Sequence, residues 1–318
     1  MFALRGIVVS SSVFAILYCL SSAAVCLTWR RIARYAQRRP VGRVADLLFA
    51  WRMLPVLFAA VVTLLFTVPS FLLLEPRAIR EPLGLIPVIT GLAGILLALY
   101  GAAHALRALF LASRAIAQWT AGAQPMNTPS SVPVLRVSAA APAMTAAGIA
   151  RSRVLLSNAA ESVMSSGEFR AALNHELAHV RRRDNLKKLM LQFVAFPGMR
   201  NLESSWLQAS EMAADDAAVA SLREALDLAA ALIKASRLSP VAAPVELTAS
   251  LVRHPAGMMS ARIERLIAWT DDRRPTPPKL SRQSLYAPAA SLAVFAVFVA
   301  HYGQMLARIH QATEWLVR

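Results

Sequence analysis

The 318-residue chain contains few cysteines and few charged residues. Its two cysteines, Cys19 and Cys26, both fall in one apolar segment, so we expect neither a disulfide nor a cysteine-ligated zinc site. Charged residues make up 16% of the chain and hydrophobic residues 57%, and the mean hydropathy is +0.48. This composition is too apolar for an ordinary soluble protein and indicates a membrane protein.

Acidic side chains are the scarcer charge, with 18 against 34 lysines and arginines, which gives a formal net charge of +16. A basic excess can indicate nucleic-acid binding, but the sequence contains no nucleic-acid-binding motif. In a chain this apolar, clustered arginines are more typical of the cytoplasmic flanks of membrane spans. We therefore expect the lipid bilayer, and not nucleic acid, as a partner.

Four apolar segments are long enough to cross a bilayer. They cover residues 7–29, 53–74, 83–106 and 286–306. Several arginines between Arg30 and Arg43 follow the first segment, whereas only Arg5 precedes it. Under the positive-inside rule this polarity places the amino terminus outside. It also argues against a cleaved signal peptide, although residues 21–24 resemble a cleavage region.

Basic residues near the third and fourth segments place the chain between them in the cytoplasm; they include Arg107, Arg114, Arg273 and Arg274. We therefore expect a mainly α membrane protein with four transmembrane helices. Residues 1–119 would hold three of them and a surface helix, and residues 120–280 a cytoplasmic domain. Residues 281–318 would hold the fourth helix and a short outer tail.

The expected cytoplasmic domain contains the pattern H-E-x-x-H at residues 175–179. On an α-helix, His175 and His179 lie on one face about a turn apart, so both imidazoles can bind one ion. Zinc accepts such nitrogens at about 2.0–2.1 Å. Glu176 is adjacent to a ligand and can act as general base toward an attacking water. This is the arrangement of a metalloprotease.

The surrounding residues favour a helix here. Ser165 and Glu168 have the spacing of a capping box, which predicts a helix that begins at residue 165 or 166. No residue before Pro197 is a helix breaker, so we expect the helix to continue without interruption to about residue 196. The alternative is a chance match on an amphipathic helix whose charged residues face water.

Two histidines leave zinc short of a third protein ligand. No H-x-x-G-x-x-H continuation follows the motif, which excludes the metzincin pattern. The downstream candidates are Glu203, Glu211, Asp215, Asp216, Glu224, Asp227 and His254. We choose Glu211, because it begins a helix of small residues, and Asp215 on the same face can orient a histidine N–H. Asp184 is a weaker candidate for that orienting role, and the alternative for these acids is a solvated helix face.

Two short strands are expected beside these helices, which makes the domain α+β. Residues 132–137 and 153–157 have strand character, and Pro133 predicts that the first is an edge strand. An edge strand could bind substrate backbone by strand addition. Residues 124–133 have the composition of a linker. Further helices are expected at residues 202–223, 223–238 and 260–270.

The sequence H-E-L-A-H-V-R-R-R-D at 175–184, followed by E-M-A-A-D at 211–215, resembles the gluzincin membrane metallopeptidases. The likeness covers about residues 130–270. It implies His175, His179 and Glu211 as zinc ligands and Glu176 as the general base. His254-Pro255 with Arg262-Ile263 is similar to the closing motif of these domains, which implies that His254 stabilises the oxyanion. A loop histidine that caps the next helix is the alternative.

Two groups share these motifs, the BlaR/MecR-type sensor and antirepressor peptidases and the CAAX prenyl protease and HtpX-type peptidases. Three spans before the domain and one after it resemble the BlaR/MecR layout. The large outer domain of those sensors has no counterpart in the dozen or so residues after Leu306, so the resemblance does not extend to β-lactam sensing.

The resemblance implies a zinc endopeptidase of the bacterial inner membrane. It would cleave a protein or peptide substrate at the cytoplasmic face, in regulatory or antirepressor-like proteolysis. One alternative is HtpX-like quality control of membrane proteins. Another is a non-catalytic signalling protein that retains the fold. Neither the substrate nor the oligomeric state follows from the motifs.

Overall fold

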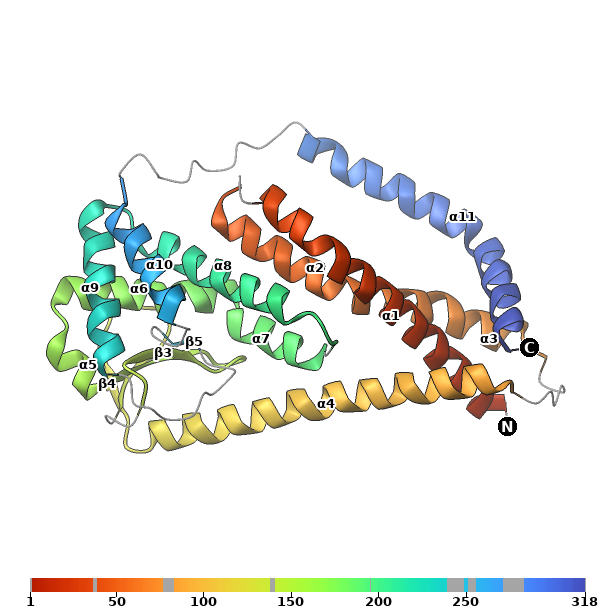
Figure 1. Cartoon of the computed structure of the whole chain (residues 1–318), viewed down its shortest axis with the longest axis horizontal. Coiled ribbons are helices and arrows are strands. Elements are labelled where there is room, and N and C mark those ends of the chain that lie inside the picture. Colours follow the sequence, from red (N-terminus) through yellow and green to blue (C-terminus); the bar gives the residue numbers. More distant parts are fainter. Residues whose placement is uncertain are drawn as a thin grey trace. The chain divides into compact units, whose positions relative to one another are not determined.

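The computed structural model describes residues 2–36, 39–76, 83–137, 141–194, 196–238, 249–250, 256–270 and 283–317. The chain forms two compact units, drawn in Figure 1. The helical unit consists of Met1–Thr28, Met53–Tyr100 and Pro275–Arg318. The sheet unit consists of Trp29–Arg52 and Gly101–Arg274. Three long helices, α1, α2 and α4, each contribute residues to both units.

The apolar segments form long helices, as expected. These are α1 (Phe2–Ala36), α2 (Val41–Val62), a π-helical turn η1 (Thr63–Thr67), α3 (Val68–Leu74), α4 (Leu85–Thr120) and α11 (Gln283–Val317). Among the described residues, three helical stretches are long and apolar enough to cross a membrane, Phe2–Arg34, Val41–Leu74 and Leu85–Thr120. They contain the first three expected spans and indicate membrane association. The expected fourth span falls in α11 and stays a prediction.

Within the helical unit, α1 and α4 approach closely at two glycines. A Cβ atom at Gly91 would lie 2.6 Å from the carbonyl oxygen of Val8, and one at Gly94 would lie 2.5 Å from that of Ser11. Lipid tails provide no hydrophobic driving force between helices, so close packing at small residues stabilises such a crossing.

The sheet unit is built around five strands in the order β1-β2-β4-β3-β5. The strands are β1 (Gln124–Met126), β2 (Val134–Val137), β3 (Met144–Ala147), β4 (Arg153–Ser157) and β5 (Ala249–Ser250). β2 and β4 are parallel, and the other pairs are antiparallel. Leu155 of β4 lies opposite Leu135 on one side and Thr145 on the other.

The prediction that residues 132–137 form an edge strand is wrong. β2 lies inside the sheet, because residues assigned to a linker form β1 and pair with it. Pro133 lies one residue before the strand, where its missing N–H costs no ladder bond. Its carbonyl oxygen accepts a hydrogen bond from the Val154 N–H at 2.9 Å. Substrate strand addition at β2 is therefore excluded.

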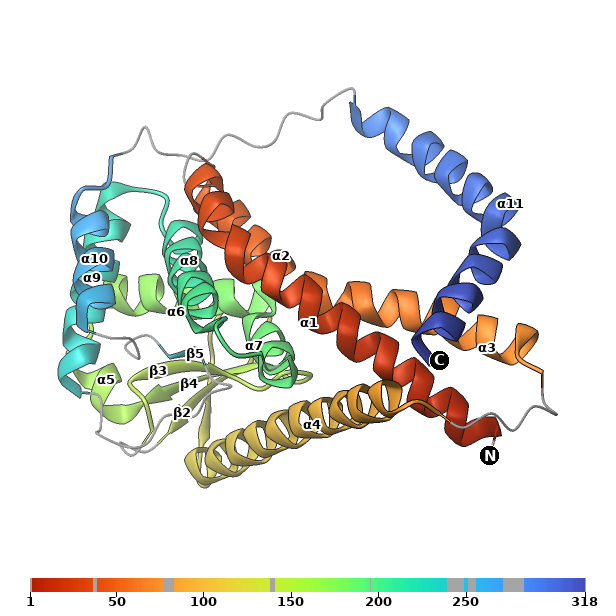
Figure 2. The same ribbon diagram turned by 45° about the vertical axis from the view of Figure 1, so that its right-hand side comes forward.

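Helices cover both faces of this sheet. In Figures 1 and 2, one face carries α6 (Ser166–Arg182), α8 (Arg200–Ala218), α9 (Leu222–Leu238) and α10 (Ala256–Ile267). Their core includes the fully buried Leu156, Leu228 and Leu266. On the opposite face, Leu155 packs against Ile116 and Trp119 at the end of α4. The short α5 (Asn158–Val163) follows β4, and α7 (Asp184–Phe193) follows α6.

The start of α6 confirms the expected capping box. Ser165 Oγ accepts from the Glu168 N–H, and the Glu168 carboxylate accepts from the Ser165 N–H at 2.7 Å. The prediction of an unbroken helix to residue 196 is wrong, because Arg183 adopts the left-handed conformation with φ 54° and ends α6. An arginine in the sequence does not predict the left-handed conformation, because that conformation costs a non-glycine residue about 1–2 kcal/mol.

Candidate metal centre

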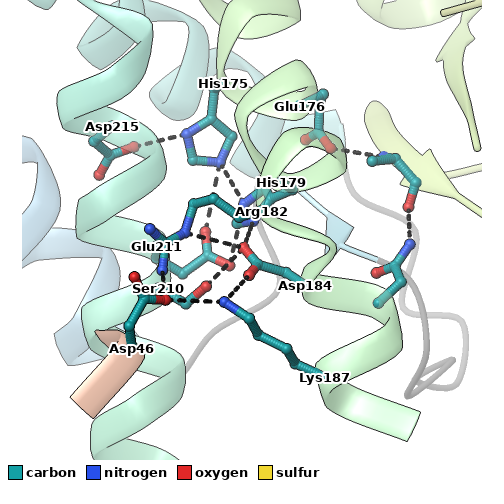
Figure 3. Close-up of polar contacts among 12 residues, drawn as sticks. Asp46, His175, Glu176, His179, Arg182, Asp184, Lys187, Ser210, Glu211 and Asp215 are labelled. Carbon is teal, nitrogen blue, oxygen red and sulfur yellow. Dashed lines mark hydrogen bonds and ion pairs between the residues drawn. The ribbon is translucent and has the colours of Figure 1, made fainter. Parts of the chain in front are cut away.

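Three buried side chains point their donor atoms at one position between α6 and α8. His175 and His179 lie one turn apart on α6, with their Nε2 atoms 3.1 Å from each other. Glu211 on α8 places Oε2 3.5 Å from His175 Nε2 and Oε1 3.5 Å from His179 Nε2. Figure 3 shows the three side chains converging, and all are almost fully buried. The structure thus brings together the three residues that the sequence predicts as metal ligands.

The spacing of these donor atoms fits a tetrahedral metal site. Ligand bonds of about 2.0–2.1 Å at tetrahedral angles separate neighbouring donors by about 3.3–3.4 Å. The two Nε2 atoms are 3.1 Å apart, each lies 3.5 Å from a different oxygen of Glu211, and one donor atom from each residue lies within 4.8 Å of the others. Two imidazoles and one carboxylate are the donor types that catalytic zinc takes from proteins, with a fourth position left open. His175, His179 and Glu211 are therefore a possible metal site.

Each histidine is oriented through its other ring nitrogen. His175 Nδ1 lies 2.9 Å from Asp215 Oδ1, and His179 Nδ1 lies 2.7 Å from Asp184 Oδ2. A hydrogen bond between His179 and Asp184, and the approach of His175 Nδ1 to Asp215, leave Nε2 of each ring as the atom that faces the site. Asp215 follows Glu211 by one turn, as expected from their spacing. Both predicted orienting acids therefore contact a histidine.

The break at Arg183 brings Asp184 to His179. In a continuous helix these two residues, five apart, would lie about 140° apart around the axis and could not bond. With α6 ended at Arg182, the carboxylate of Asp184 turns back toward the imidazole (Figure 3). Ser210 on α8 donates a second hydrogen bond to the same carboxylate oxygen, at 2.8 Å. Asp184 is fully buried, so surface charge does not explain it.

Arg262 on α10 is a component of the site that sequence reasoning did not assign. Its Nε and one terminal nitrogen donate to both oxygens of Asp215, at 2.8 and 2.6 Å. The other terminal nitrogen lies 3.1 Å from Glu211 Oε2. Although burial opposes ionisation, Arg262 holds the pKa of Asp215 well below its usual range. The R-I motif at residues 262–263 pointed to Arg262 in the sequence, but it did not predict that the arginine would bind Asp215.

Glu176 follows His175 on α6, about 100° further round the helix, and its carboxylate faces β3. Its carboxylate accepts a hydrogen bond from the backbone N–H of Ala146 at 2.6 Å. Burial raises the pKa of Glu176 to about 7, with the two histidines opposing the shift. A general base works best when its pKa is close to the working pH. This environment agrees with the general-base role predicted for Glu176 from the sequence.

The strand that contacts Glu176 is fixed by Asn185. The side-chain amide of Asn185 donates to the carbonyl oxygens of Ala146 and Gly148, at 3.0 and 3.2 Å. Gly148 has a φ of 89°, which glycine adopts without strain. The end of β3 is thereby held against the start of α7.

Three of the other candidate acids have partners elsewhere. Glu203 forms an ion pair with Arg52 at 2.8 Å, and Asp216 with Arg265 at 2.6 Å. The Glu224 carboxylate accepts from the Ala220 N–H at 2.7 Å. The expected oxyanion residue His254 lies outside the described residues, so its role stays a prediction.

A helical histidine pair and a distant glutamate that share one buried position, beside a carboxyl group of near-neutral pKa, are features typical of metal-dependent hydrolases. Residues 113–270 match the model of Peptidase family M48. The matched region includes the whole centre and supports a membrane-type zinc metallopeptidase. No curated protein matches the chain.

Proposed function

We propose that the protein is a membrane-embedded zinc endopeptidase that cleaves a protein segment at the cytoplasmic face of the bacterial inner membrane. The observation that carries the proposal is the pair of inward-facing Nε2 atoms, 3.1 Å apart, each on a ring whose Nδ1 contacts a buried carboxylate. If Glu211 only formed a structural ion pair between α6 and α8, both histidine rings would not need to face its carboxylate.

His175, His179 and Glu211 would hold the ion. When bound, zinc supplies Lewis acidity to the scissile carbonyl and lowers the pKa of the attacking water. Glu176 takes the proton from that water and later gives it to the leaving amine, which its near-neutral pKa permits. Asp215 and Asp184 keep the imidazoles oriented, and Arg262 keeps Asp215 ionised. His254, by resemblance, would stabilise the oxyanion.

Regulatory cleavage is the physiological role that we propose, as the resemblance to the BlaR/MecR-type peptidases implies. Quality control of membrane proteins is the alternative, and the range of substrates separates the two. Membranes that contain either the wild-type protein or Glu176→Gln can be compared by proteomics for peptides with new termini. We expect one or a few substrates that accumulate uncut in the variant. Many unrelated substrates would favour quality control, and identical proteomes would contradict the proposed peptidase.

A further inference from the structure

One face of the first three turns of α2 contacts the helices that surround the metal centre, α6, α7 and α8. Gly42, Asp46, Phe49 and Arg52 follow one another at intervals of four, three and three residues, which places them in one stripe. All four belong to the sheet unit. They lie in the first part of Val41–Leu74, a stretch that is long and apolar enough to cross a membrane. This stripe is not explained by the proposed catalysis.

Asp46 contacts two cations at the junction of α6 and α7. Its Oδ1 lies 3.1 Å from a terminal nitrogen of Arg182 and 3.0 Å from Lys187 Nζ. The same two side chains approach Asp184, with Arg182 Nε 3.8 Å and Lys187 Nζ 3.7 Å from its carboxylate oxygens. Figure 3 shows Arg182 and Lys187 between the two acids. The cations are therefore shared between Asp46 and the acid that orients His179.

The rest of the stripe anchors this arrangement. Lys187 Nζ lies 5.6 Å from the ring centroid of Phe49, within the range of a cation–π contact. The side chain of Arg52 is only 1% exposed and pairs with Glu203 on α8 at 2.8 Å. Arg52 also donates to the carbonyl oxygen of Val194 at the end of α7. The stripe thus holds the helix that bears Asp184 and the helix that bears Glu211.

Sharing of the cations affects His179 directly. Asp184 Oδ2, the atom that contacts His179 Nδ1, is also the atom nearest Arg182. If Asp46 loses its charge, both cations are released toward Asp184 and compete with the imidazole N–H for its oxygens. The Asp46 side chain is 60% exposed, so solvent screens its pairs with the two cations, whereas the oxygens of the fully buried Asp184 are screened less. A weaker acceptor on Nδ1 makes Nε2 a poorer metal ligand.

We propose that Asp46 is a positioning residue for the metal centre, which acts through Arg182 and Lys187 on Asp184 and so on His179. The inference rests on the proposed metal site. It assigns a role to the cytoplasmic part of a predicted membrane helix. A displacement of α2 would move Asp46 away from Arg182 and Lys187, and both cations would then interact more strongly with Asp184.

The experiment compares Asp46→Asn, Asp46→Glu and Asp216→Asn in the full-length protein in detergent. Asp216→Asn is the matched control, because it removes the same charge from an ion pair that contacts neither histidine. The readouts are the zinc dissociation constant from chelator competition and the visible spectrum of the cobalt-loaded protein. We expect Asp46→Asn to weaken zinc binding about 3–10-fold, less than the roughly 10–100-fold loss typical of a group that touches a ligand. It should also shift the cobalt bands, while Asp46→Glu and Asp216→Asn leave both unchanged.

A second comparison separates positioning from folding. In a Lys187→Met background the effect of Asp46→Asn should shrink, because one of the two cations that transmit it is missing. An undiminished effect would overturn the mechanism. If Asp184→Asn weakens zinc binding but Asp46→Asn does not, the inference fails and the proposed metal site stands. If the wild-type protein binds no zinc, the proposed function itself fails.

Discussion

Arg262 donates two hydrogen bonds to Asp215, 47 residues earlier in the chain, and Asp215 in turn contacts His175 Nδ1 at 2.9 Å. The arginine, the acid and the imidazole come from α10, α8 and α6. The orientation of His175, a proposed zinc ligand, therefore depends on Arg262 through Asp215, although Arg262 does not itself need to bind metal.

Arg262→Ala should destabilise the sheet unit strongly, because it leaves the buried Asp215 and Glu211 without their cation. Removal of one partner from a buried ion pair costs about 3–5 kcal/mol. Arg262→Lys should cost less, since it keeps the charge but loses the two-point contact. Chemical denaturation of the metal-free protein measures both changes. Equal stability of wild type and Arg262→Ala would show that the buried charges are compensated in another way.

Glu176→Gln should retain zinc and lose peptidase activity by about 10²–10⁴-fold, because the residue moves a proton and is not a ligand. His175→Ala and His179→Ala should lose both metal and activity. Zinc content of the purified proteins, measured beside hydrolysis of an unstructured protein substrate, distinguishes the two classes. Full activity in Glu176→Gln would remove this residue as the base.

The third ligand can be identified by the order of three variants on α8. Glu211→Ala should lower zinc occupancy severely, and Asp215→Ala should weaken affinity by about 10–100-fold. Asp216→Asn should leave affinity unchanged. Glu203, another of the candidate acids on α8, is unsuitable as a control because its loss would leave the buried Arg52 without this partner. A site that stays full in Glu211→Ala but empties in Asp216→Asn would reassign the ligand.

Glu168 provides a pH test of the capping box. Burial alone would raise its pKa, but the bond to Lys234 and the Ser165 N–H lower the pKa below its usual value. A carboxyl group with a lowered folded-state pKa stabilises the protein above the unfolded pKa of about 4.3. That contribution is lost as the pH falls through the folded-state value.

Glu168→Gln should therefore cost about 1 kcal/mol at pH 7. The difference from wild type should shrink below pH about 4.3. Denaturant titrations of the metal-free protein at several pH values measure it. A difference that is constant across this range would contradict the linkage.

The topology prediction places residue 36 and residue 150 in the cytoplasm and residue 316 outside. The basis is the arginine excess beside the spans, together with the expected fourth span in α11. Single-cysteine variants at these positions, in a background without Cys19 and Cys26, can be labelled with a membrane-impermeant reagent. Labelling of residue 150 from outside would reverse the whole orientation. Protection of residue 316 would remove the fourth span.

The parts of the site that the sequence predicts are those governed by helical spacing. His175 and His179 lie one turn apart on α6, and Glu211 and Asp215 one turn apart on α8, so each helix fixes its own pair. The capping box at Ser165 is equally local. Contacts between distant parts of the chain could not be predicted in this way, because no spacing rule connects Arg262 to Asp215.

The wrong predictions have equally specific causes. Arg183 ends α6 without glycine, asparagine or proline to mark the end, and Asp184 gains its place only through that break. The edge-strand prediction gave weight to Pro133, which lies just outside β2. Residues 124–126 pair through backbone groups, and their composition resembles that of a linker.

The distribution of the centre along the chain has a consequence for synthesis. His175 and Arg262 are separated by 87 positions, and Glu211 lies between them. A ribosome releases the amino-terminal helices into the bilayer well before α10 emerges. The nascent chain therefore carries its histidine pair with neither the third donor nor the compensating guanidinium in place. The proposed metal centre is therefore complete only after α10 has docked and Arg262 has reached Asp215 and Glu211.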